Sequence, residues 1–187
     1  TDTHLSAPVQ DAIQSWVKSG GILWADFTAL ARNQYDEDSG AMNETFGLAA
    51  RGALPDPGRS PDPEARGETI QVLAREKLEP VAFEGSAFRP AWTLSTGESL
   101  ATFTNGQPAL VRNRFEKGQA VLMGCSALAL SPYGKQSDSP TEFPKIRRIL
   151  ELGTDLAGAA RHCRLSVPRV NAFVRDGPNQ TVLFLIN

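Results

Sequence analysis

The chain has 187 residues, of which 41% are apolar and 21% charged, and its formal net charge is −2. This size and composition predict a soluble globular protein with one domain of ordinary size. The nearly balanced charge argues against nucleic acid or an anionic membrane as a partner, and no apolar run approaches the ~18 residues of a membrane-spanning helix. The two cysteines, Cys125 and Cys163, are too few for a disulfide scaffold and fit either a cytoplasmic or an exported protein.

A helix followed by a buried strand is predicted at the start of the chain. Ser6 suits the N-cap, Pro8 suits the first turn, and Gly20 suits the left-handed end of the helix. Five apolar residues recur at the helical period and so share one face: Val9, Ala12, Ile13, Trp16 and Val17. Residues 22–25 follow as a buried strand, which makes this segment half of a βαβ crossover. The strand that should precede the helix is missing, so we expect the chain to have been cut from a larger protein.

Regular patterns weaken between residues 28 and 67. Residues 43–48 predict a short helical turn with Asn43 as its N-cap, and four prolines within residues 55–63 predict an extended loop. Three short strands are predicted after this loop, at residues 70–73, 81–83 and 91–94.

A β-meander is predicted over residues 100–123. The two-residue turn Asn105-Gly106 should join residues 100–104 and 109–113 in a hairpin. A second turn, Glu116-Lys117-Gly118, leads into the continuous apolar run at residues 120–123, which is typical of a strand buried on both faces. This strand ends at the tripeptide Gly124-Cys125-Ser126.

The C-terminal part predicts a helix and a second hairpin. The helix begins near Pro144 and keeps its period to Ala160. The hairpin pairs residues 170–174 with residues 181–186, and it either joins the main sheet or begins a further β domain. We therefore expect an α/β domain over residues 1–163 and a β-hairpin over residues 164–187.

Three segments, in this order, resemble a known family. They are WVKSGGILWADF at residues 16–27, ARNQYDEDSGAMNETFGL at residues 31–48 and NGQPALVRNRFEKGQAVLMG at residues 105–124. Together they resemble the trimerisation domain of bacterial β-galactosidases of the glycoside hydrolase 42 type, which is similar in fold to class I glutamine amidotransferases. The tail, residues 170–187, resembles the start of the small β-sandwich that follows this domain. The proline-rich loop and the missing first strand depart from the family pattern.

The resemblance implies a fold and a role. The fold is an α/β, three-layer flavodoxin or class I glutamine amidotransferase-like sheet, truncated at the N-terminus and extended by a C-terminal β-hairpin. In the family, a separate (β/α)8 barrel carries the two catalytic carboxylates, while this domain helps to assemble the oligomer and can wall off the active site. It implies a non-catalytic structural module that self-associates or packs on a catalytic domain. We expect no cofactor.

Cys125 is a candidate nucleophile because it lies where a strand meets a loop. The glycines that flank an amidotransferase nucleophile are replaced by Met123 and Ala127, and the only histidines available as a base are His4 and His162. We therefore expect Cys125 to be a packing residue, with a cysteine-dependent hydrolase or amidotransferase as the alternative. His162-Cys163 lacks the further ligands that a zinc site requires, so we expect no metal site there.

Two other groups are candidate ligand-binding residues. Asp36 and Asp38 lie in a dense acidic loop that could hold Ca²⁺ or supply paired carboxylates, but it lacks the order of an EF-hand, so a solvated loop is expected. Trp16 and Trp24 are expected in the core, which leaves Trp92, in an irregular segment, as the tryptophan that could be exposed. Trp92 is thus the candidate sugar contact of a carbohydrate-binding module, the third functional hypothesis.

Overall fold

The computed structural model describes residues 4–52, 69–72, 81–82, 90–124, 155, 171–178 and 180–186. The chain divides into two compact units, Thr1–Gly153 and Thr154–Asn187. No helix in the described part of the chain is both long enough and apolar enough to cross a membrane.

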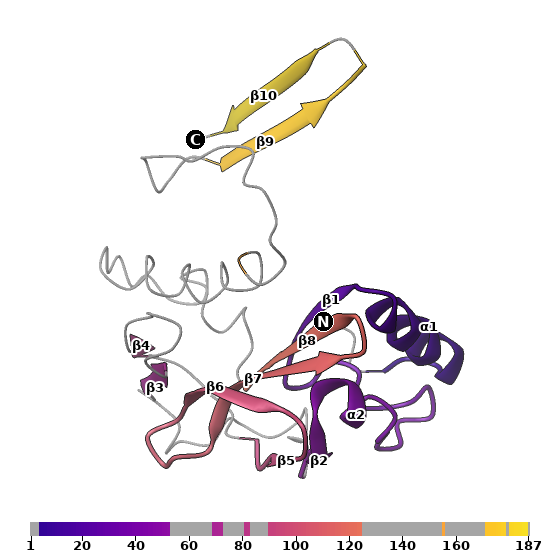
Figure 1. The fold of residues 1–187 in the computed structure, drawn as a ribbon, viewed down its shortest axis with the longest axis vertical. Helices are drawn as coiled ribbons and strands as arrows, with labels where there is room; N and C mark the ends of the chain where they lie inside the picture. The colour runs from indigo at the N-terminus through magenta and orange to yellow at the C-terminus, as the bar shows by residue number, and fades with distance from the viewer. Residues whose placement is uncertain are drawn as a thin grey trace. The chain divides into compact units, whose positions relative to one another are not determined.

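The first unit is a mixed α/β structure built on one large sheet (Figure 1). Its elements are α1 (Ala7–Lys18), β1 (Ile22–Asp26), α2 (Asn43–Phe46), β2 (Leu48–Ala50), β3 (Thr69–Val72), β4 (Val81–Ala82), β5 (Thr93–Leu94), β6 (Glu98–Thr102), β7 (Pro108–Phe115) and β8 (Gly118–Met123). The sheet has the order β1-β8-β7-β6-β3-β4, while β2 and β5 form a separate pair. Strands β1 and β8 run parallel, and the other described pairings are antiparallel.

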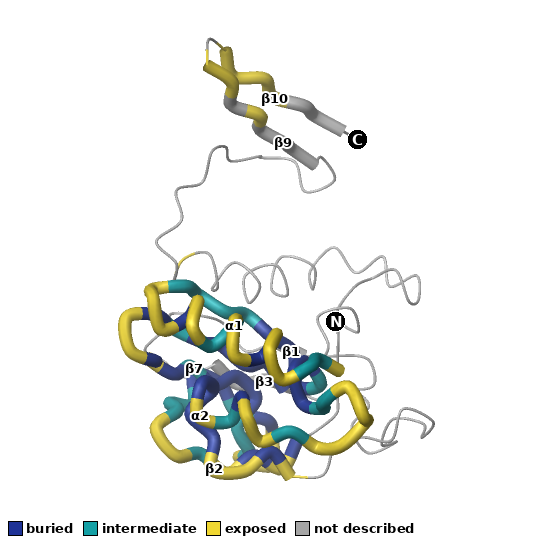
Figure 2. The backbone as a smooth tube through the Cα atoms, turned by 90° about the vertical axis from the view of Figure 1, so that its right-hand side faces the viewer, coloured by how far each residue is buried: buried dark blue, intermediate teal, exposed yellow. Residues whose placement is uncertain are grey.

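Helix α1 forms as the sequence predicts, but a different part of its surface is buried. Ser6 has the extended conformation of an N-cap without a side-chain capping hydrogen bond, and Gly20 follows the helix with φ of +119°. Most of α1 is exposed (Figure 2). Its buried side chains are Gln10 and Val17, whereas Trp16 is 51% exposed. The prediction of Trp16 as a core residue is therefore wrong. The predicted apolar stripe is wide, and its inward part runs through Gln10, Ile13 and Val17, of which Ile13 is partly buried against the core cluster.

The β6–β7–β8 meander confirms the predicted hairpin and buried strand. The first turn has three residues rather than two, because the Gly106 N–H donates to the Phe103 carbonyl and the Phe103 N–H donates to the Gln107 carbonyl. Gly106 supplies the left-handed residue that this loop requires, with φ of +81°. Strand β8 is buried along almost its whole length and pairs with β1 on one side and β7 on the other.

The core of the first unit gathers around α2. Met42 and Phe46 are fully buried and pack in one cluster with Leu48, Trp92 and Leu122. Met42, not Asn43, precedes the helix, which ends at Gly47 in the left-handed conformation. The predicted strands at residues 70–73, 81–83 and 91–94 correspond to β3, β4 and β5.

In the second unit, β9 (Asn171–Asp176) and β10 (Thr181–Ile186) pair antiparallel in a two-stranded sheet. Val182 and Leu183 of β10 are exposed. The predicted loop at residues 55–63 lies outside the described residues, as does the predicted helix near residues 144–160 apart from Asp155.

Candidate functional site at the carboxyl end of β1

The parallel strands β1 and β8 end at the same edge of the sheet, where Asp26 is paired in register with Met123. Open α/β sheets bind ligands outside the carboxyl ends of their parallel strands. Asp26 is buried at this edge. The edge is therefore the part of the described structure where the fold itself favours a site.

Asp26 uses only one of its two carboxylate oxygens. Its Oδ1 accepts hydrogen bonds from the Thr28 N–H at 3.2 Å, the Thr28 hydroxyl at 3.0 Å and the Ala29 N–H at 3.1 Å. These bonds hold the turn that follows β1. Its Oδ2 is buried and accepts no hydrogen bond from any described residue. Half of the carboxylate thus remains available at the strand end.

Arg51, just after β2, is buried in the same region, with 7% of its surface exposed. Its Nη1 donates to the Ala29 carbonyl at 2.8 Å, and its guanidinium lies over the Phe46 ring at 5.0 Å from the centroid. Burial lowers the pKa of Arg51 to about 10, while the charge of Asp26 opposes this shift. The guanidinium is therefore still charged at neutral pH, and its Nε and Nη2 donate to no described residue.

The available oxygen of Asp26 and the two available nitrogens of Arg51 define what this cluster can do. A water molecule or a hydroxyl group both donates and accepts hydrogen bonds, so either is a chemical match for the pair. Neither side chain is a nucleophile with a partner base. The hydrogen bonds that the structure shows are to Thr28 and Ala29, so the cluster fixes the turn after β1, which is a structural role.

We expect Arg51→Met to lower the free energy of unfolding by about 1–3 kcal/mol, because the Ala29 carbonyl loses its donor and the Asp26 carboxylate loses its nearby cation. The methionine retains apolar contact with Phe46. Urea unfolding followed by far-UV circular dichroism measures the change. Arg114→Met, at an exposed position of β7, is the control and should shift stability by no more than about 0.5 kcal/mol. Equal effects of the two substitutions would contradict a special role for Arg51.

The predicted acidic residues Asp36 and Asp38 lie in an exposed loop and are partly neutralised by the protein itself. Asp36 Oδ1 accepts hydrogen bonds from Arg32 Nη1 and, at 2.6 Å, from His4 Nε2. These bonds, the one from Arg32 first, hold the pKa of the Asp36 carboxyl below its usual value. Arg32 Nε also lies 3.7 Å from Asp38 Oδ1. Within the described residues, no three potential metal ligands come together.

The loop is ordered by residues that the sequence reading did not select. Asn33 Oδ1 accepts hydrogen bonds from the N–H groups of Tyr35 and Glu37, and Asn33 Nδ2 donates to Glu37 Oε2 at 2.8 Å. The Ser39 hydroxyl donates to Gln10 Oε1, which connects the loop to α1. The only local signal for this arrangement is the turn preference of asparagine.

Trp92, the candidate sugar contact, is a buried residue. It is only 7% exposed and belongs to the core cluster that contains Phe46, so its indole does not offer the open face that a sugar contact needs. The irregular segment that carries it packs onto the core, a tertiary effect that local composition does not signal. Cys125, His162 and Cys163 lie outside the described residues.

No protein-family model matches the sequence, and no curated protein matches it. Solved structures do match. The β-galactosidase from Rahnella sp. R3 aligns with a TM-score of 0.72 at 19% identity, over 99% of this chain and 26% of that chain. The β-galactosidase from Bacillus circulans sp. alkalophilus aligns with a TM-score of 0.69 at 17% identity, over 99% of this chain and 26% of that chain.

A third structure is Gan42B, a GH42 β-galactosidase from G. stearothermophilus, with a TM-score of 0.61 at 14% identity. The alignment covers 98% of this chain and 24% of that chain. The present chain thus spans about a quarter of the length of these β-galactosidases. At such low identities the likeness is one of fold. The chain has an α/β fold that these β-galactosidases contain within about a quarter of their length.

Proposed function

We propose that this chain is a non-catalytic structural module of a carbohydrate-active, β-galactosidase-like protein and that it acts by self-association. One observation carries the proposal: the match covers 99% of this chain but only 26% of the first β-galactosidase. A segment that accounts for a quarter of an enzyme chain has the size of an accessory domain. The buried polar groups of the described core support a structural role, because Asp26 and Arg51 bond to backbone groups of the neighbouring turn.

The finer assignment is also part of this proposal. We infer that this chain is a trimerisation-type domain of the glycoside hydrolase 42 family and that its layers are arranged as the three layers of class I glutamine amidotransferases. Helix α1 directly before β1, and the parallel pairing of β1 with β8, support it, because helices on a parallel sheet are the unit of such folds.

Self-association is the form of the proposal that can be tested on this chain alone. We expect light scattering after gel filtration to give a molar mass above that of one 187-residue chain, rising with concentration. We also expect no hydrolysis of an aryl β-galactoside above the buffer rate. A monomer at the highest soluble concentration would overturn the proposed self-association, and hydrolysis by the purified chain would overturn the non-catalytic role.

A further inference from the structure

The first unit exposes two aromatic surfaces of opposite charge. We define the basic aromatic patch as Trp16, Lys18 and Lys117, and the acidic aromatic loop as Tyr35, Glu37 and Asp38. All six side chains are exposed. Tryptophan and tyrosine are the residue types that most often dominate the binding energy of protein interfaces.

Trp16 is held in place at the centre of the patch. A Cβ atom added to Gly21 would lie 2.5 Å from both Cδ2 and Cε2 of the indole, so the ring packs directly against the Gly21 backbone. The Trp16 carbonyl accepts hydrogen bonds from the Gly21 N–H and the Ser19 hydroxyl. The indole is therefore supported on one side, yet 51% of the residue remains exposed. An ordered, exposed aromatic ring loses little entropy when a partner covers it.

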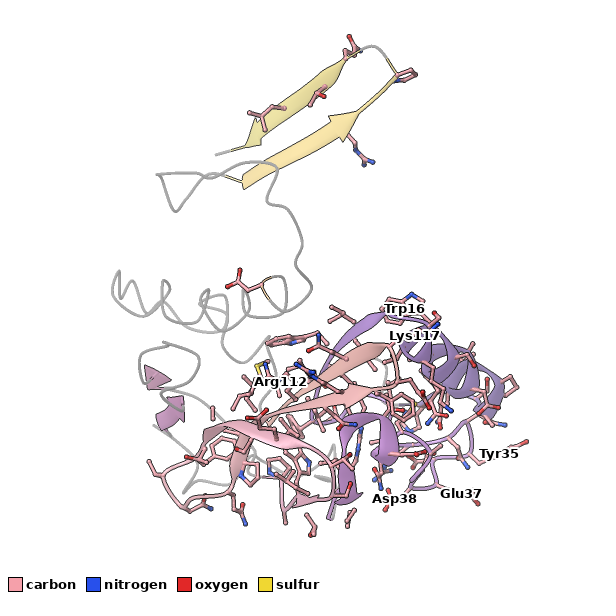
Figure 3. All side chains as sticks on the ribbon, in the orientation of Figure 1. Trp16, Tyr35, Glu37, Asp38, Arg112 and Lys117 are labelled. Carbon is pink, nitrogen blue, oxygen red and sulfur yellow. The ribbon has the colours of Figure 1, made fainter. Side chains whose placement is uncertain are left out.

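Two lysines give the patch its charge. The Lys117 N–H donates to the Lys18 carbonyl at 3.3 Å, so the turn between β7 and β8 lies against the end of α1. Figure 3 shows Trp16 and Lys117 close together at the upper edge of the unit. Lys18 Nζ lies 5.2 Å from the centroid of Phe115.

The acidic aromatic loop presents a matching set of groups. Tyr35 is 73% exposed at the tip of a turn that Asn33 holds through the N–H groups of Tyr35 and Glu37. Arg32 and His4 bond to Asp36, and Arg32 Nε also lies 3.7 Å from Asp38 Oδ1, so Glu37 carries most of the uncompensated negative charge among the described residues of the loop. In Figure 3 the labelled side chains of this loop lie along the lower right edge of the unit, well away from Trp16.

We propose that the acidic aromatic loop of one copy of this chain docks on the basic aromatic patch of a second copy. The proposal rests on the proposed self-association and names its surfaces. Opposite charges at the rim orient the partners, and the aromatic residues supply the buried centre. The two surfaces are different parts of one unit, so the contact is head-to-tail. Repeated contacts of this kind form a closed ring when the rotation from one copy to the next divides a full turn evenly.

Charge reversal tests this contact by light scattering of the 187-residue chain at low salt. Lys117→Glu and Glu37→Lys should each weaken association about tenfold, because each places like charges across the contact. An equimolar mixture of the two variants should associate again, since the unaltered patch of Glu37→Lys meets the unaltered loop of Lys117→Glu, and the two altered surfaces are also opposite in charge. Tyr35→Ser should weaken association by about tenfold or more. Arg175→Glu makes the same charge change at an exposed position in the second unit and should have no effect.

Circular dichroism establishes that each variant is folded. If the wild-type chain associates and the variants associate equally well, the docking surfaces are wrong while the proposed self-association stands. If both single variants weaken association but their mixture fails to restore it, the pairing of patch with loop is wrong. A wild-type chain that remains monomeric overturns both proposals.

Discussion

Asn113→Asp is expected to lower the free energy of unfolding by about 3–5 kcal/mol at neutral pH. Asn113 is buried in β7, where its Nδ2 donates to the carbonyls of Glu44 and Thr45, both at 3.0 Å, and its Oδ1 accepts from the Thr96 hydroxyl. A carboxylate of the same shape would place a negative charge against two carbonyl oxygens. Urea unfolding monitored by tryptophan fluorescence measures the loss.

The pH dependence of this variant separates the electrostatic cause from a packing defect. Burial and the two carbonyls should raise the pKa of the introduced carboxyl in the folded state above its unfolded value. The folded state then binds the proton more tightly, so the stability deficit is smallest below the unfolded pKa and grows as the pH rises through the folded pKa. Asn105→Asp is the matched control, because Asn105 lies in an exposed turn and its Oδ1 accepts a hydrogen bond from the Gln107 N–H, which a carboxylate oxygen can also accept. It should change stability by about 0.5 kcal/mol at most. A deficit that does not vary with pH would contradict the electrostatic cause.

Gly118→Ala is expected to destabilise the fold by about 3 kcal/mol, because the added methyl group would overlap backbone atoms. A Cβ at this position would lie 2.0 Å from the Val17 carbonyl oxygen and 2.3 Å from the Gly21 carbonyl oxygen. Neither is the end of a flexible side chain, so α1 must move away from β8. Thermal unfolding followed by circular dichroism measures the effect.

Gly40→Ala is the control for Gly118→Ala. The nearest atom to a Cβ at Gly40 is Asn43 Nδ2, at 3.6 Å, which is ordinary contact. We expect a change of no more than about 0.5 kcal/mol in either direction. If the two substitutions had the same effect, the close approach of α1 to β8 would not be a source of stability.

Local sequence signals predicted the elements whose formation is itself local. The turn residues between β6, β7 and β8 and the apolar run of β8 define the meander, and the helical period with Gly20 defines α1. Even there, the turn at Gly106 is one residue longer than predicted, since a two-residue loop and a three-residue loop share the Asn-Gly signal.

Local sequence signals did not predict the contacts of the candidate site, which join residues that are far apart in the sequence. Asp26 and Arg51 come from separate elements and meet only because the turn after β1 lies beside the segment after β2. Asn113 reaches residues 68 and 69 positions away along the chain. The sequence predicts Gly118 as a turn glycine, whereas in the structure its missing side chain also allows the end of α1 to approach β8 closely. No pattern within a window of ten or twenty residues encodes these contacts.

The sequence alone determined the mixed α/β character, the meander and the resemblance to a domain of β-galactosidases, because periodicity, turn residues and motif order are properties of neighbouring residues. Only the tertiary structure decided which tryptophan is exposed and which is buried, and which polar residues lie in the core. An amphipathic period shows that a face is apolar, but burial depends on the part of that face that another element covers. Trp16 lies beyond the part of α1 that is buried, and Trp92 belongs to the buried cluster that contains Phe46 and Leu48.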